Sequence, residues 1–245
     1  RTSMDMVIRE KVTAVFTAID PSGGGTRSEV GIVSGFHVGG ETVICGLEAI
    51  AAKREYEYLP IIVEHLKQLK QTPGLENAVR IVLLENNMGL VATNIYDEIK
   101  HHFFEDVIIL NKANYDISNE KLHHAAKIRK TNQSIGLRTD GTVKESMYVG
   151  WKNALSQHKL HFYEKLVCVF NNNKGQPMEE ENLNKLKQQY LNYMICFRTP
   201  DTSNIAFQEV VKTYSGKPHG PDDLATAAML FYYWSMKYIL DPGFR

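Results

Sequence analysis

An apolar strand that ends on an acid limits the possible folds of this chain more than any other feature of the sequence. Residues 12–19 carry small and β-branched apolar side chains on both faces, which is typical of a strand covered on both sides. Asp20 follows directly, and the loop after it contains three consecutive glycines at residues 23–25. Such a strand needs layers of other elements above and below it, and it leaves a carboxylate at its end.

Two more strand-like runs follow the glycine-rich loop. They span residues 30–38 and 41–45, and the intervening Gly39 and Gly40 can adopt the positive φ angles of a two-residue hairpin turn. The first three strands are therefore predicted to be antiparallel.

Farther along the chain, predicted helices alternate with predicted strands. Helical spacing of apolar residues predicts helices at residues 55–71, 89–104, 142–158 and 179–195, and a last one from Pro221. Short apolar runs predict strands at residues 79–84, 107–110, 166–170 and 205–214. The expected fold class is α/β, with a mixed sheet whose three antiparallel strands are continued by parallel strands and flanked by helices.

The whole chain, residues 1–245, is expected to form one domain, because no repeat or low-complexity tract divides it. Residues 111–140 are polar, basic in their second half and only weakly periodic. This stretch is predicted to be an insertion or a mobile region.

Composition narrows the classes of function. Lys and Arg number 28, as do Asp and Glu, so the net charge is zero and indiscriminate binding of polyanions is not favoured. No apolar run approaches the roughly eighteen residues of a membrane helix, and residues 1–20 lack the pattern of a secretory signal. We therefore expect a soluble protein that is neither secreted nor bound to a membrane. Three scattered cysteines indicate neither a disulfide framework nor a zinc cluster.

Acids stand at the ends of three predicted elements. Asp20 ends the first strand, Glu85 ends the strand at residues 79–84, and Asp222 and Asp223 begin the last helix. If the two strands are parallel neighbours, their acids share one rim of the sheet. Each acid alone also has a structural explanation, since Asp stabilises turns and acids in a first helical turn favour the helix dipole.

Converging carboxylates would repel one another, and a divalent cation would relieve that repulsion. Oxygen ligands suit Mg²⁺ or Mn²⁺ rather than zinc. Carboxylate clusters of this kind can hold two such ions about 4 Å apart, one activating the attacking water and the other stabilising the leaving oxygen of a phosphodiester. Glycines after Asp20 would let a phosphate backbone approach closely.

Several segments resemble the nuclease domain of viral DNA-packaging terminase large subunits, and herpesvirus-type versions resemble them most. They are AIDPSGGG (residues 18–25), VRIVLLENN (79–87) and YSGKPHGPDDLATAAML (214–230). GLRTDGTVKESMYVGWKNAL (136–155) is similar to the family segment in which a short turn and a Lys precede a helix. The resemblance extends, with gaps, over almost the whole chain and implies an RNase H-like fold.

The resemblance also implies a function and a set of site residues. Asp20, Glu85 and Asp222 would be catalytic metal ligands, with Asp223 an auxiliary acid or alternative ligand. The implied activity is metal-dependent endonuclease cleavage of concatemeric double-stranded viral DNA during genome packaging, with two Mg²⁺ or Mn²⁺ ions as cofactors.

The same resemblance implies partners and a place in the cell. An N-terminal packaging ATPase domain would precede this domain in a longer chain. The terminase small subunit and the capsid portal would be further partners. The site of action would be the host nucleus for a herpesvirus-type protein and the host cytoplasm otherwise.

Binding of DNA requires positive side chains along its path. Candidates for phosphate contact, which a solvated loop could also carry without binding DNA, are Lys127, Arg129, Lys130, Arg138, Lys144 and Lys217. No predicted helix carries an evident set of base-reading side chains, so weak sequence specificity is expected.

Two other functions stay open at this level. Actin-like or sugar-kinase-like phosphotransferases also carry an Asp followed by glycines in their first hairpin, although they use two lobes and a second glycine-rich phosphate loop. A catalytically silent domain could instead keep the fold for docking DNA or the capsid portal.

Overall fold

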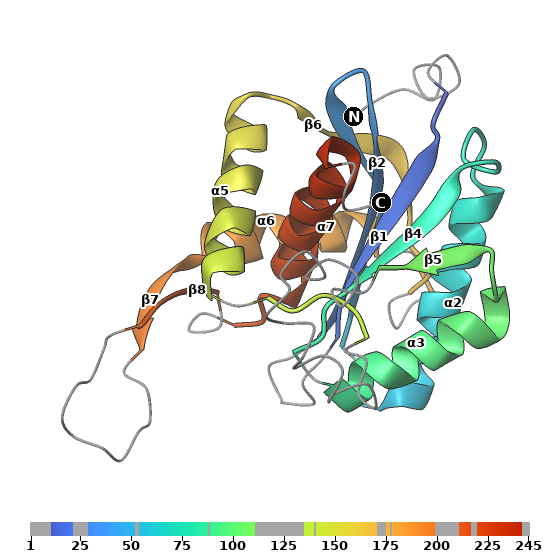
Figure 1. Ribbon diagram of the computed structural model, residues 1–245, viewed down its shortest axis with the longest axis horizontal. Helices are drawn as coiled ribbons and strands as arrows, with labels where there is room; N and C mark the ends of the chain where they lie inside the picture. Colours follow the sequence, from blue (N-terminus) through green and yellow to red (C-terminus); the bar gives the residue numbers. More distant parts are fainter. Residues whose placement is uncertain are drawn as a thin grey trace, which may run out of the picture.

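Six strands form the central sheet of the computed structural model, in the order β5-β4-β1-β2-β3-β6 (Figure 1). Their bounds are Ala14–Asp20 for β1, Val30–Val38 for β2, Glu41–Ile50 for β3, Val79–Leu84 for β4, Val107–Ile109 for β5 and Leu160–Val167 for β6. β2 is antiparallel to both β1 and β3, whereas β4 joins β1, β5 joins β4 and β6 joins β3 in parallel pairings. The predicted mixed sheet is confirmed.

The structure describes residues 11–21, 29–51, 54–87, 89–110, 135–139, 141–170, 175–176, 178–198, 211–216 and 220–241. The predicted insertion or mobile region at 111–140 therefore lies outside the described residues, except for 135–139.

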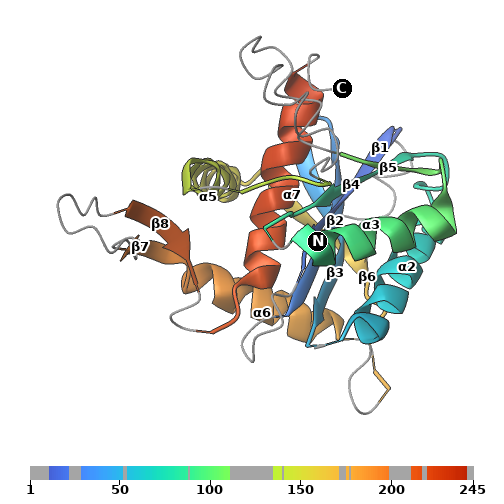
Figure 2. The same ribbon diagram turned by 60° about the horizontal axis from the view of Figure 1, so that its bottom comes forward.

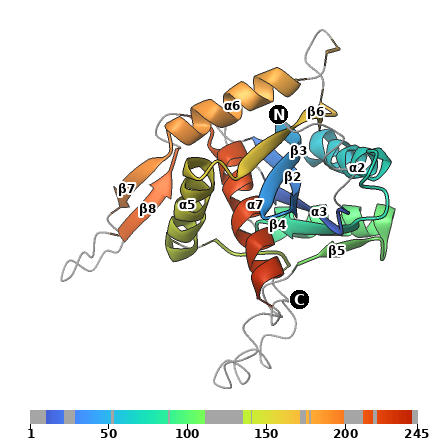
Figure 3. The same ribbon diagram turned by 90° about the horizontal axis from the view of Figure 1, so that it is seen from above.

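Helices cover both faces of the sheet (Figures 2 and 3). α2 (Glu55–Gln71) and α3 (Gly89–Phe103) lie on one face. α7 (Asp223–Leu240) lies on the other, with α5 (Gly141–Ser156) and α6 (Glu179–Leu191) beside it. β1 is buried between these layers, as its apolar residues on both faces predict. No helix in the described ranges is long and apolar enough to cross a membrane.

The β2–β3 hairpin forms where the glycine pair predicts it. Gly39 and Gly40 have φ angles of 57° and 82°, in the region that side chains disfavour. β3 continues beyond the predicted end at residue 45, because β2 offers a pairing partner along its whole length and Val30 stands opposite Ile50.

Two predictions for the second half of the chain are wrong. β6 occupies Leu160–Val167 rather than residues 166–170, because it is an edge strand whose partly exposed side chains do not form an apolar run. The helix predicted at 179–195 ends at Leu191, and Met194–Arg198 forms β7 instead. β7 pairs antiparallel with β8 (Val211–Ser215) in a two-stranded sheet that projects from the body of the molecule (Figures 1 and 2).

A chain of buried polar side chains ties α2 to the sheet. The hydroxyls of Thr17 and Ser34 are 2.9 Å apart, and Ser34 Oγ lies 2.9 Å from His65 Nε2. His65 Nδ1 is 3.0 Å from Glu48 Oε1, and both of these side chains are fully buried. Glu48 also accepts hydrogen bonds from the backbone N–H groups of residues 169 and 170, just after β6. A buried acid is tolerated in β3 because both carboxylate oxygens of Glu48 accept hydrogen bonds.

Candidate active site

Parallel pairing of β1 with β4 brings two of the predicted acids together. Ile19 stands opposite Leu84, and the backbone N–H of Glu85 donates to the carbonyl of Ile19 at 2.9 Å. Asp20 and Glu85 are only 6% and 5% exposed, and their carboxyl groups are close enough for Glu85 to raise the pKa of Asp20. The two carboxyl groups therefore share one rim of the sheet, where the ends of parallel strands collect ligands.

The first turn of α7 lies against the neighbouring strand β2. Gly31, which pairs with Asp20, faces the helix so closely that a Cβ atom there would be 2.4 Å from the carbonyl oxygen of Asp223. Absence of a side chain at Gly31 thus lets the helix start beside Asp20. The negative charge of Asp223 is close enough to raise the pKa of Asp20.

The two acids of the pair at the start of α7 have different surroundings. Asp222 Oδ2 accepts hydrogen bonds from Ser215 Oγ at 3.0 Å and from the backbone N–H of Gly216 at 2.8 Å. Asp223 Oδ2 accepts one from the backbone N–H of Glu29 at 2.9 Å. Asp222 therefore joins the start of α7 to the end of β8, whereas Asp223 joins α7 to the start of β2.

Electrostatics at this rim favour a bound proton in the absence of a cation. Burial is the largest cause of the raised pKa of Asp20, followed by the charge of Glu85, the hydrogen bond to Glu85 and the charge of Asp223. Lys144, in the second turn of α5, acts in the opposite direction and lowers the pKa of Asp20. Burial also raises the pKa of Tyr193, and the charges of Asp222, Asp20 and Glu85 add to this effect.

The stability of the metal-free protein should therefore depend on pH through Asp20. Its folded pKa lies above 3.8, so the unfolded chain releases the proton first, and the folded state loses stability as the pH rises from 3.8 toward the folded pKa. Asp20→Asn cannot ionise. At about pH 8 in EDTA, its melting temperature should exceed that of the wild type by roughly 2–4 °C for each kcal/mol of repulsion relieved.

Thermal melts of both proteins between about pH 5 and about pH 8 measure this difference, and titrating groups common to both cancel in the comparison. If the two melting temperatures ran parallel over that range, the ionised form of Asp20 would carry no penalty in the folded protein.

Two residues that the sequence did not single out hold Glu85. Asn87 Nδ2 donates to Glu85 Oε1 at 2.8 Å, and Thr139 Oγ1 donates to the same oxygen. Thr139 falls within the stretch predicted to be an insertion or a mobile region, and backbone hydrogen bonds join Leu137 of this stretch to the end of β4. The resemblance of the segment from Gly136 onward to the terminase family was the signal that pointed to this place.

The predicted DNA-contacting residues are only partly placed. Arg138 is exposed next to Thr139, and Lys144 is half-buried near Asp20. The remaining candidates lie outside the described residues, and they are Lys127, Arg129, Lys130 and Lys217.

The donor chemistry of the rim fits a hard divalent cation. Carboxylate oxygens are the ligands that Mg²⁺ and Mn²⁺ take, and a cation would relieve the repulsion that raises the pKa of Asp20. Across the described ranges, however, no group of three or more His, Cys, Asp or Glu side chains is arranged to enclose a metal ion. The acids are thus gathered at one rim without forming a closed metal cage.

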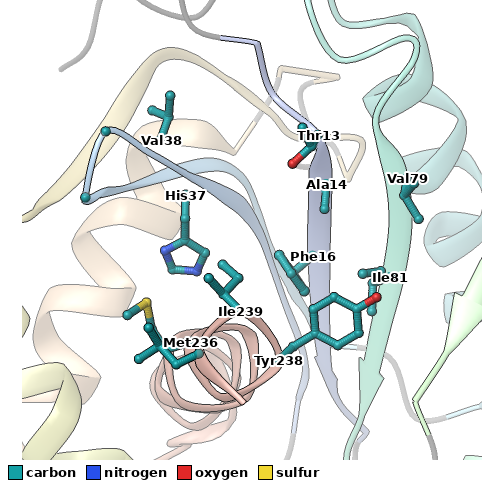
Figure 4. A pocket seen from close by; sticks show the side chains of 13 residues that line it. Thr13, Ala14, Phe16, His37, Val38, Val79, Ile81, Met236, Tyr238 and Ile239 are labelled. Carbon is teal, nitrogen blue, oxygen red and sulfur yellow. The ribbon is translucent and has the colours of Figure 1, made fainter. Parts of the chain in front are cut away.

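An apolar cavity of about 530 Å³ lies at the opposite end of the sheet (Figure 4). It is lined by the starts of β1 and β4, by the β2–β3 turn and by the end of α7, whereas the acids follow the other ends of β1 and β4. His37 lines it, and burial lowers the pKa of this imidazole to about 4. Ser235 Oγ donates its proton to the carbonyl of Phe231, so it accepts a hydrogen bond from His37 Nε2 at 2.6 Å. Thr42 Oγ1 lies 3.0 Å from the other ring nitrogen, Nδ1. Both nitrogens of the neutral imidazole therefore have a hydrogen-bond partner.

Comparison with known proteins identifies the fold. No protein-family model and no curated protein sequence match this chain. The nuclease domain of human cytomegalovirus terminase, Mn-soaked and inhibitor-bound, matches with a TM-score of 0.56 and 13% identity over 91% of this chain and 83% of that one. The same domain in another structure matches with a TM-score of 0.51 and 14% identity over 95% and 84%.

A phage protein gives a similar result. The nuclease domain of the large terminase subunit gp2 of bacterial virus Sf6 matches with a TM-score of 0.51 and 15% identity over 90% of this chain and 88% of that one. The chain therefore has the RNase H-like fold of terminase nuclease domains, as its sequence resemblance predicts.

Proposed function

We propose that this chain is a terminase nuclease domain that cleaves double-stranded DNA during viral genome packaging, by metal-dependent hydrolysis of phosphodiester bonds. The observation that carries the proposal is the position of Asp20 and Glu85 on one rim with Asp223 beside them, in a fold shared with terminase nuclease domains. The raised pKa of Asp20 supports it, because groups with strongly shifted pKa values cluster at functional sites.

Asp20 and Glu85 would hold two divalent cations together with an acid from the start of α7. The cytomegalovirus domain was soaked with Mn in two of the similar structures, which supports the use of Mn²⁺ or Mg²⁺ here. When bound, the cations would activate the attacking water and stabilise the leaving oxygen. Asp20 would give up its proton as the cations bind, and Lys144 favours that ionised form.

Asp223 is the better third ligand of the adjacent pair. Its charge acts on Asp20, whereas Asp222 is not among the causes of the raised pKa of Asp20. Asp222 Oδ2 already accepts two hydrogen bonds from Ser215 and Gly216. Asp222 would then act by holding the start of α7 against the end of β8.

Lys144, which lies near Asp20, and Arg138, which is exposed next to Thr139, would contact the phosphates of a bound DNA strand. Contacts to phosphate carry little sequence information, so cleavage should show weak sequence preference. A packaging ATPase domain, a small terminase subunit and a capsid portal are the partners that this function requires. The proposed site of action is the host nucleus for a herpesvirus-type protein and the host cytoplasm otherwise.

Incubation of the purified domain with supercoiled plasmid tests the proposal. We expect nicking and linearisation at scattered positions with Mn²⁺ or Mg²⁺, and no cleavage with EDTA. No nucleotide should be needed, which separates this function from a phosphotransferase. Absence of cleavage with either ion would instead favour a catalytically silent docking domain, and cutting at a single site would contradict weak specificity.

A further inference from the structure

We propose that Thr139 and Asn87 are positioning residues that hold the carboxylate of Glu85 in one orientation for a metal ion. This inference rests on the proposed function. It adds two uncharged side chains to the acids of the proposed metal site.

The three side chains form a closed set of hydrogen bonds. Thr139 Oγ1 donates its single proton to Glu85 Oε1. Asn87 Nδ2 lies 2.8 Å from Glu85 Oε1 and 2.8 Å from Thr139 Oγ1. Because an amide nitrogen has two protons, Asn87 can supply both contacts at once. Two donors thus converge on one carboxylate oxygen of Glu85.

The backbone fixes this arrangement from both sides. Leu137 N donates to the carbonyl of Leu84 at 2.7 Å, and Asn86 N donates to the carbonyl of Leu137 at 2.9 Å. These bonds form a parallel bridge between Glu85 and Leu137, only two residues before Thr139. Gly136 permits the approach, since its φ is +79° and a Cβ there would lie 2.5 Å from the carbonyl oxygen of Leu84.

Burial makes the orientation rigid. Thr139 is 6% exposed and Glu85 is 5% exposed, so water does not compete freely for their hydrogen bonds. A carboxylate held in this way loses little rotational freedom when it binds a cation. Removal of such outer hydrogen bonds typically lowers metal affinity by about 10–100-fold.

Titration of the domain with Mn²⁺ in a calorimeter tests the inference. Thr139→Val removes the hydroxyl at nearly constant volume and should weaken Mn²⁺ binding by about 10–100-fold. Thr139→Ser keeps the hydroxyl and should bind within about threefold of the wild type. Thr142→Val makes the same change at an exposed position in the first turn of α5 and should have no effect.

Cleavage provides a second measurement. Plasmid cutting by Thr139→Val should need a higher Mn²⁺ concentration for half its maximal rate and should recover largely at saturating Mn²⁺. Asn87→Ala, at an exposed position, leaves no cavity and provides the same test if Thr139→Val does not fold; we expect about tenfold weaker binding.

The outcomes distinguish failure of the positioning role from failure of the proposed nuclease function. Wild-type Mn²⁺ affinity in a folded Thr139→Val or Asn87→Ala variant would overturn the positioning role while leaving the nuclease intact. A wild-type domain that neither binds Mn²⁺ nor cuts DNA would overturn the proposed function, and the positioning role with it.

Discussion

Asp20→Asn is expected to abolish metal-dependent cleavage of plasmid DNA, with the rate falling by at least about 10²–10³-fold. An amide oxygen in place of the carboxylate removes one negative charge from the rim where Asp20, Glu85 and Asp223 interact. The change leaves side-chain volume nearly unaltered. Initial rates of nicking at saturating Mn²⁺ measure the effect, and Glu85→Gln should behave in the same way.

A matched control separates this loss from a general effect of charge. Asp97→Asn makes the same substitution at an exposed position on α3 and should cleave at the wild-type rate. Asp20→Asn is also expected to be the more thermally stable protein without metal, so unfolding cannot account for lost activity. Cleavage by Asp20→Asn at the rate of Asp97→Asn would refute the role of the carboxylate.

Gly31→Ala is expected to displace α7 and to lower both stability and cleavage. Its new Cβ would lie 2.4 Å from the carbonyl oxygen of Asp223 and 2.8 Å from the backbone nitrogen of Leu224. Backbone atoms cannot rotate away as a flexible side chain can, so the helix must shift. We expect the free energy of unfolding to fall by about 1–3 kcal/mol and the melting temperature to fall by about 2–4 °C for each kcal/mol. We also expect a loss of cleavage, because Asp223 moves with the helix.

The chain offers a control glycine in a different environment. Gly150 lies within α5, where a Cβ would meet its nearest neighbour, the ring of Tyr232, at 3.5 Å, an ordinary contact distance. Gly150→Ala should therefore be neutral or stabilising by up to about 1 kcal/mol, because alanine favours a helix. Melts by circular dichroism with parallel cleavage assays compare the two variants, and a Gly31→Ala protein as stable and active as Gly150→Ala would contradict the close packing of α7 on β2.

Local patterns were sufficient for much of the fold. α2 begins and ends at the predicted residues, Glu55 and Gln71, and β4 occupies the predicted residues 79–84. These elements depend on the periodicity of neighbouring side chains, which a sequence displays directly. Where exposed residues interrupt the periodicity, as in β6, or where one pattern runs into another, as from α6 into β7, the predicted bounds are wrong.

The sequence by itself determined which acids end the elements of this fold, because Asp20 and Glu85 each stand at the end of an apolar run that local pattern identifies as a strand. Only the tertiary structure decided that Thr139, separated by 54 positions, donates to Glu85. It also decided that Asp222 binds the end of β8, whereas Asp223 adjoins Asp20. These differences depend on which backbone segments pack together. Such contacts join residues far apart in the chain, and no local periodicity records them.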